Sequence, residues 1–456
     1  MGKNIEGLTQ LKGTLEDFLE GYQERRRTFR EFPKVDIEGI FSIWDNYLAF
    51  LDKNKEAEEK ERAKVTKDLR DKGVIGKDEV LGLINITGGF DVTIDSIAKQ
   101  FFANYRSKLL ETYPEMKEGK ISHGVDDIFN DSDLPAFFLH DINHLHADLT
   151  QQFWTIFSPK ADYGVNRMRD CREEVRRFLE RYNSNPESIY GAYLEPYKML
   201  HFITTTELGE KPMVEQFQPA KLAMQTALIL QNRYVQAEYS LVERLSNSKT
   251  NEIAVDGEEF TLNGNSGVVF SIIYNLAKNA YKKLGSKANN SQKIFIQVYE
   301  APFSSYVISV GDSGKPIDLN VMKDKVRQLV LNKGIDNVSF PTNGSKKRYQ
   351  RWQNSEYEVG GLTVKDITDV AFMARMSGFD NADKFSSGMG LYGVRYFLNN
   401  VGGKILYGEN FENGGPLFTC IIPKKFPSNG IERHINSMLS KIPEMQLSYS
   451  GNPRAV

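Results

Sequence analysis

The chain has 456 residues, of which 40% are hydrophobic and 26% charged, and its 58 basic residues nearly balance its 60 acidic ones. This length gives room for about three domains of ordinary globular composition, and the balanced charge argues against a nucleic-acid partner. Only Cys171 and Cys420 occur, which argues against a disulfide framework. The sequence has no run of about 18 apolar residues and no signal-peptide core, so we expect a cytoplasmic protein with no integral membrane segment.

Residues 1–125 are predicted to form a mainly helical N-terminal domain. Leu15 to Tyr47 has an amphipathic helical pattern, and Leu51 to Arg70 mixes charges of both signs, as a solvated helix does. No repeat or motif indicates a role for this region. Its place before the rest of the chain makes it a candidate input domain.

A helical hairpin is predicted over residues 130–212. Asp133 is a suitable N-cap for a helix that continues to about Phe157. Val165 to Tyr182 has the pattern of a charged helix returning antiparallel to the first, and more helix follows to about Thr205.

Several histidines lie close together on the first helix of this hairpin. His140 and His144 are one turn apart, Asp141 follows His140, and His146 lies just beyond. One interpretation is a polar rim on a helical bundle. A second is a metal site, because His140 and His144 have the spacing of helix-borne zinc ligands, although the stretch has Asp where the HExxH motif has Glu and no third ligand is evident.

A helix is predicted from Ser266 to Leu284, because apolar residues recur at steps of three and four along it. Asn275 and Asn279 are one turn apart and therefore share a face of this helix. Before it, Asp256 to Thr261 and the following turn have the pattern of a short hairpin.

Two glycine-bearing turns follow. The stretches Lys293 to Tyr299 and Tyr306 to Val310 have the pattern of a strand pair, and the second leads into a turn that contains Asp312 and Gly314. Further on, the stretch that begins with Gly388 opens a second apolar-striped helix, and two strands are predicted after it, over residues 405–407 and 417–423.

These residue types suit ATP. The carboxylate of Asp312 can accept a hydrogen bond from the adenine amine, and Gly314 lets the backbone approach the base. Asn279 offers a neutral oxygen ligand to Mg2+. Gly388 and Gly390 allow backbone N–H groups at a helix N-terminus to face phosphate oxygens.

The order of these motifs resembles that of the histidine-kinase-type ATPases, the GHKL family. The stretch from Asn275 through Asn279 is similar to the N box, Asp312 to Gly314 to the G1 box, and Gly388 through Gly390 and Leu391 to the G2 box. The resemblance implies a Bergerat α/β sandwich over residues 214–425. Lys282, one turn after Asn279, can add a point charge near the phosphates. One departure is Pro316, which stands where the G1 box usually has its second glycine.

The same resemblance bears on the reaction. Hydrolysing members of the family carry a glutamate, acting as general base, at the position of Asn275, so its absence favours transfer of the phosphate to a side chain over transfer to water. The sequence His140-Asp141 resembles an H box, which implies that His140 attacks the γ-phosphate while Asp141 accepts its other proton. His144 occupies the position where the family often has a residue that orients water for dephosphorylation.

The sequence therefore predicts an α+β protein: a helical N-terminal region, a helical-hairpin dimerisation and phosphotransfer domain, a Bergerat ATPase domain and a polar tail over residues 426–456. The implied function is an ATP- and Mg2+-dependent protein histidine kinase that autophosphorylates on His140, with His144 and His146 as other candidate acceptors. It would pass the phosphoryl group to an aspartate of a separate response-regulator receiver, and it would be a homodimer through the hairpin. The alternative is a GHKL-type ATP-binding switch or ATPase without histidine phosphorylation.

Overall fold

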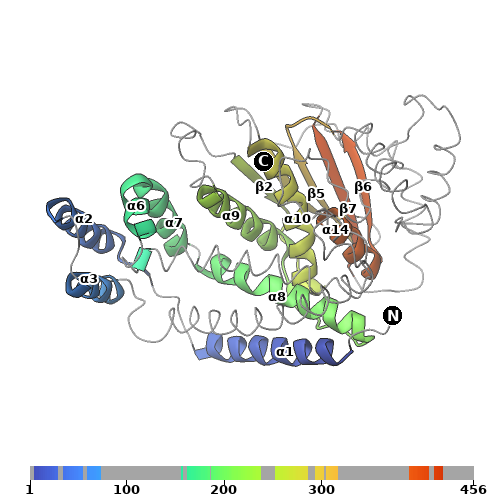
Figure 1. The fold of residues 1–456 in the computed structure, drawn as a ribbon. Coiled ribbons are helices and arrows are strands. Elements are labelled where there is room, and N and C mark those ends of the chain that lie inside the picture. The colour runs from blue at the N-terminus through green and yellow to red at the C-terminus, as the bar shows by residue number, and fades with distance from the viewer. Residues whose placement is uncertain are drawn as a thin grey trace, which may run out of the picture. The chain divides into compact units, whose positions relative to one another are not determined.

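The computed structural model describes residues 5–28, 34–54, 59–72, 156–157, 162–184, 186–237, 252–285, 293–301, 304–316, 390–409 and 415–424. The chain forms two compact units. The first comprises residues 1–213 and 232–245, and the second comprises residues 214–231 and 246–456. The α+β fold class predicted from the sequence is confirmed, since helices fill the described part of the first unit and the second contains a mixed sheet (Figure 1).

The helices of the first unit are α1 (Ile5–Thr28), α2 (Ile37–Lys53), α3 (Glu59–Lys72), α6 (Asp162–Asp170), α7 (Arg172–Ser184) and α8 (Pro186–Leu208). The charged helix predicted from Leu51 begins only at Glu59, because residues 51–53 complete α2. The helix predicted over residues 165–182 is divided at Cys171, whose carbonyl oxygen accepts a hydrogen bond of 3.0 Å from the N–H of Val175 as α7 begins.

Helices α1 and α8 pack together through apolar side chains. Leu11 and Leu15 of α1 are fully buried, as is Leu200 of α8, and the rings of Phe18 and Tyr197 lie 4.7 Å apart. Burial of apolar side chains between two helices supplies most of the stability of a packed helix pair, at about 25 cal/mol for each Å² of apolar surface removed from water.

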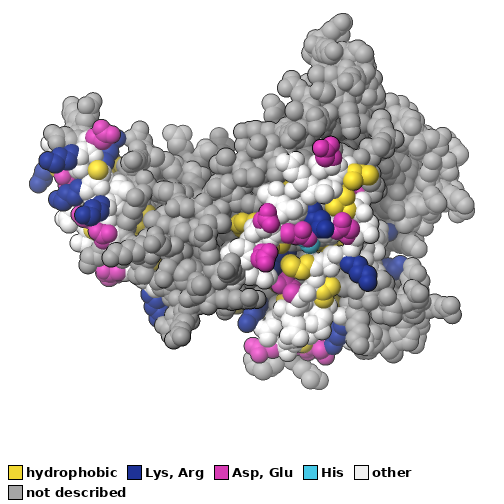
Figure 2. All heavy atoms as spheres, turned by 90° about the horizontal axis from the view of Figure 1, so that it is seen from below, with side chains coloured by type: hydrophobic (Ala, Val, Ile, Leu, Met, Phe, Trp, Pro, Cys, Tyr) yellow, Lys and Arg dark blue, Asp and Glu magenta, His cyan; other side chains and the backbone are white. Residues whose placement is uncertain are grey.

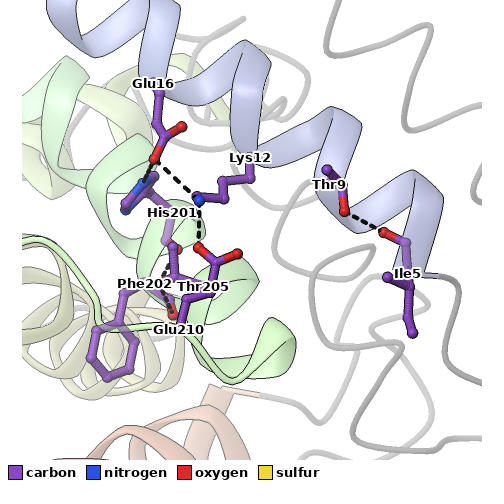
Figure 3. A network of polar contacts seen from close by, with 8 residues as sticks. All are labelled: Ile5, Thr9, Lys12, Glu16, His201, Phe202, Thr205 and Glu210. Atoms are coloured by element: carbon purple, nitrogen blue, oxygen red, sulfur yellow. Dashed lines mark hydrogen bonds and ion pairs between the residues drawn. The ribbon is translucent and has the colours of Figure 1, made fainter.

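A polar network lies along the same helix pair (Figure 3). Glu16 of α1 lies 3.3 Å from Nε2 of His201 on α8 and 3.7 Å from Nζ of Lys12, which in turn pairs with Glu210. Figure 2 shows that the described acidic and basic side chains are interspersed around a histidine on this face. Opposite charges thus offset one another here.

Helix α2 buries an aromatic face against its neighbours. Trp44 is fully buried, and its Nε1 donates a hydrogen bond of 2.9 Å to the carbonyl oxygen of Ile156. The guanidinium groups of Arg172 and Arg176 lie 4.6 and 4.7 Å from the centre of the Phe41 ring, within the range of cation–π attraction. The same two arginines form ion pairs with acidic residues of α2, so charge and ring contacts together hold α7 against α2.

The main sheet of the second unit has five strands in the order β2-β4-β5-β7-β6. The strands are β2 (Glu252–Gly257), β4 (Lys293–Ala301), β5 (Ser305–Asp312), β6 (Lys404–Glu409) and β7 (Pro416–Pro423). Strand β2 pairs parallel with β4, and all other pairs are antiparallel. Every residue of β5 is buried, which fits its central position.

Two helices cover one face of this sheet (Figure 1). Helix α10 (Ser266–Gly285) packs against β4 and β5, helix α14 (Gly390–Asn400) packs against β6, and the two helices contact each other. Helix α9 (Pro219–Ala237) precedes them, and residues 219–231 of it belong to this unit. The predictions of α10, of the β4–β5 pair, of α14 and of the β6–β7 pair are confirmed.

One local prediction is wrong. The stretch from Asp256 to Thr261 was expected to begin a short hairpin, but β2 ends at Gly257 and pairs with β4 instead. The next strand, β3 (Leu262–Gly264), pairs antiparallel with β1 (Glu215–Phe217) in a separate small sheet. The pairing partners of β2 and β3 each lie tens of residues away along the chain, so the pairing cannot be predicted from the local sequence pattern.

Candidate functional site

Helix α10 positions the two asparagines of the predicted site. Its N-cap is Asn265, whose Oδ1 accepts a hydrogen bond of 3.1 Å from the N–H of Val268. Along the helix Val268 and Ile272 are buried, and this apolar face fixes the rotation of α10 on the sheet. Asn275 lies at the middle of the helix and Asn279 one turn further on, on the same side.

The amide group of Asn275 is anchored within the helix. The side chain is only 5% exposed, and its Nδ2 donates to the carbonyl oxygen of Ser271 at 2.9 Å and lies 3.2 Å from the Ser271 hydroxyl oxygen. The nitrogen end of the amide therefore points back along α10. Asn279 is half-buried and lies nearer the C-terminal end of the helix.

The start of α14 comes close to this pair of amides. A β-carbon built on Gly390 would lie 3.3 Å from Oδ1 of Asn275, 3.5 Å from Nδ2 of Asn279 and 3.7 Å from Oδ1 of Asn279. A side chain at this position would occupy the space between the helix start and the two amides, which glycine leaves open. The structure thus brings Gly390 of the predicted G2 box against both asparagines of the predicted N box. Leu391, the next residue, lies in the first turn of α14 and is half-buried.

Asp312 stands at the end of the central strand. The residue pairs with Ile294 of β4 and is 3% exposed, and its Oδ1 accepts a hydrogen bond of 2.7 Å from the N–H of Gly314. This bond closes an Asx turn, which fixes where the chain leaves the sheet. Lys315 and Pro316 follow and are exposed.

Several predicted site residues lie outside the described part of the chain. Lys282 is within α10, but nothing is described of its side chain, and Gly388 falls outside the described residues. His140, Asp141 and His144 also fall outside the described residues. Their roles remain predictions.

A small apolar depression lies at the other end of α10. It is lined by residues of the helix start, of β1 and β3, and of the adjoining ends of β5 and β7, among them Val268, Leu262 and Tyr306. Burial raises the pKa of the Tyr306 phenol, so this tyrosine stays neutral. Since Asn275 and Asn279 do not line the depression, it is distinct from the predicted nucleotide site.

The chemistry of the described residues fits a nucleotide with its metal ion. Two amide side chains supply neutral oxygens of the kind that Mg2+ accepts, and the glycine start of α14 leaves the space that a phosphate group would need. The buried carboxylate of Asp312 supplies an acceptor for a base amine. Burial lowers the pKa of the Arg395 guanidinium on α14.

The sequence did not single out Ser271, which proves to be a hydrogen-bond partner of Asn275. Its only signal was its position four residues before Asn275, which places both side chains on one face of a helix.

No family model matches the sequence, and no curated protein sequence matches it. Solved structures do match. The mycobacterial sensor histidine kinase MprB has 11% identity and a TM-score of 0.27, and the match covers 47% of this chain and 100% of that one. The catalytic domain of the histidine kinase ThkA has 17% identity and a TM-score of 0.27, with 46% of this chain and 96% of that one covered.

A third match, full-length ShkA in complex with AMPPNP, has 13% identity and a TM-score of 0.30, and covers 66% of this chain and 47% of that one. The chain is similar to histidine kinases.

Proposed function

We propose that this protein is an ATP-dependent protein histidine kinase. The proposal rests on one observation: Gly390 lies more than a hundred residues along the chain from Asn275 and Asn279, yet it comes close to both of them on one side of the sheet. A close approach of a helix start to two amide side chains suits a phosphate chain and its metal ion.

In this proposal the nucleotide-binding residues contact different parts of ATP and its metal ion. Asp312 accepts a hydrogen bond from the adenine amine, and its Asx turn with Gly314 keeps the carboxylate in place. Asn275 and Asn279 offer oxygen ligands to Mg2+, which neutralises phosphate charge when bound. Gly390 presents its backbone N–H group to the phosphates, and we expect Gly388 to present another. Lys282 adds a positive charge.

The transfer step uses the histidine cluster. The unprotonated ring nitrogen of His140 attacks the γ-phosphorus, a P–N bond forms, and the bond to the β,γ-bridging oxygen breaks so that ADP leaves with the electron pair. Asp141 accepts the hydrogen bond of the other ring nitrogen and stabilises the positive charge that develops on the ring. Asn275 supplies no carboxylate base for water, which favours this acceptor over hydrolysis.

The phosphoryl group then passes to an aspartate of a separate receiver domain. This step, a homodimer formed through the helical hairpin and a cytoplasmic location belong to the same proposal. Among the described residues, no helix is long and apolar enough to span a bilayer.

The experiment that tests this proposal is incubation of the full chain with γ-labelled ATP and Mg2+, followed by measurement of protein-bound label. Wild type should take up label, and Asn279→Ala should lose most of it. Asn400→Ala is the matched control, since Asn400 lies at the far end of α14 and donates to the carbonyl oxygen of Tyr396 at 2.9 Å.

The control variant should label like wild type. ATP turnover by wild type without any protein-bound label would overturn the kinase proposal in favour of a nucleotide-dependent switch or ATPase. Absence of ATP binding would overturn both.

A further inference from the structure

Ser271, one turn before Asn275, anchors the amide of that residue but has no role in the proposed phosphoryl transfer. Ser271 is 3% exposed and lies on the face of α10 that carries Asn275. Two of its atoms, the backbone carbonyl oxygen and Oγ, lie 2.9 and 3.2 Å from Nδ2 of Asn275. Both residues are buried, so these contacts are shielded from competition by water.

These contacts fix which end of the amide faces the site. A backbone carbonyl can only accept a hydrogen bond, so the amide atom beside it must be the nitrogen. The oxygen then points away from α10 toward α14, where Oδ1 lies 3.3 Å from the position of a β-carbon on Gly390. The hydroxyl of Ser271 is a second acceptor for the same nitrogen, and it reinforces this orientation.

The orientation matters because the two ends of an amide have opposite chemistry. The amide oxygen accepts hydrogen bonds, and it is the atom that a hard divalent cation takes as a ligand. The reversed amide would present N–H donors to the cation and would place its oxygen against the carbonyl oxygen of Ser271. Loss of a group that orients a metal ligand typically lowers metal affinity by about 10- to 100-fold.

We propose that Ser271 is a positioning residue: its hydroxyl holds the amide of Asn275 with Oδ1 turned toward the metal ion of the bound nucleotide. This inference rests on the proposed use of ATP with Mg2+. Because the backbone carbonyl remains when the hydroxyl is removed, we expect a smaller effect than for loss of a whole orienting group, about 5-fold, as for one hydrogen bond.

The test is Ser271→Ala in the full chain, with two readouts. The first is the Mg2+ concentration that half-saturates labelling by γ-labelled ATP, and the second is ATP affinity with the metal removed by EDTA. The variant should need about 5-fold more Mg2+ while its metal-free affinity is unchanged. Ser271→Thr keeps a hydroxyl at the same position and should restore the wild-type Mg2+ requirement.

Ser266→Ala is the matched control, because Ser266 is also a buried serine of α10, and its hydroxyl donates to Glu215 at the other end of the helix. It should leave the Mg2+ requirement unchanged. An unchanged Mg2+ requirement in Ser271→Ala would overturn the inference, as would an equal loss of Mg2+-dependent and metal-free affinity, which is the mark of a structural defect. A wild-type chain that neither labels nor binds ATP would instead overturn the proposed function, and this inference with it.

Discussion

Replacement of Gly390 by alanine tests whether the start of α14 forms part of the nucleotide site. The new methyl group would lie 3.3 Å from Oδ1 of Asn275 and 3.5 Å from Nδ2 of Asn279. The first distance is tighter than ordinary van der Waals contact, so the end of the Asn275 amide must move by a few tenths of an ångström, whereas the second distance is an ordinary contact. Both atoms belong to side chains, which makes the shift cheap for folding.

The expected effect on folding is therefore small. Gly390 is the first residue of α14, so the gain that alanine brings over glycine in the middle of a helix does not apply, and only the shift of one side-chain end has to be accommodated. The effect on binding is larger, because a displaced amide loses its contact with the charged nucleotide or its metal. A hydrogen bond to a charged group contributes about 1.5 to 3 kcal/mol, so ATP affinity should fall about 10- to 100-fold.

The assay pairs calorimetric titration of ATP with Mg2+ against the thermal midpoint of unfolding. Gly403→Ala is the control, because its β-carbon would lie 2.7 Å from Cδ2 of Leu398 and 3.1 Å from the carbonyl oxygen of Ile421. The control should lower the midpoint and leave the ATP affinity of the folded protein unchanged. Unchanged affinity in Gly390→Ala would refute the placement of the nucleotide beside α14.

Three further outcomes follow from the described contacts. Asp312→Ala should weaken ATP about 10-fold or more through loss of a charged acceptor; equal affinity for wild type and variant in a competition assay would exclude a role in binding the base. A hydrogen bond from Arg176 lowers the pKa of Glu38, so its ion pair stabilises the fold above the ordinary carboxyl pKa of 4.5 and is lost as the pH falls through the lowered value. Glu38→Gln should accordingly lower the thermal midpoint at neutral pH, with the difference vanishing in acid; a difference that grows in acid would contradict this sign. Trp44→Phe should cost about 1 to 3 kcal/mol in urea unfolding, because it leaves the buried carbonyl of Ile156 without its donor; a cost near zero would show that the bond contributes nothing.

The second unit is the part of the fold that local sequence pattern predicted well. Helix α10 has apolar residues at the helical period, which indicates both the element type and its buried face, and strand β5 is a short apolar run typical of a buried strand. The parallel pairing of β2 was missed because register between distant segments depends on tertiary packing. The break at Cys171 was missed because the charged pattern continues across it.

Some residues of the candidate site could likewise be predicted from the sequence and others could not. Residue type and spacing indicated Asn275, Asn279 and Asp312, because adenine, phosphate and Mg2+ each require a particular kind of atom. The closeness of Gly390 to the two amides could not be predicted from spacing, since it arises where α10 and α14 contact each other on the sheet. The contact between Ser271 and Asn275 was missed although it is local, because a serine inside a helix has many possible partners.

The central claim, phosphoryl transfer to a histidine, is tested most directly by the chemistry and position of the label. Wild type, His140→Gln and His144→Gln should be incubated with γ-labelled ATP and Mg2+, and the protein-bound label then exposed to acid and to base. We predict a label that is lost in acid, stable in base, present in His144→Gln and absent in His140→Gln. A label of the same amount in His140→Gln would contradict the assignment of the acceptor, and no label in wild type that binds ATP would contradict the kinase itself.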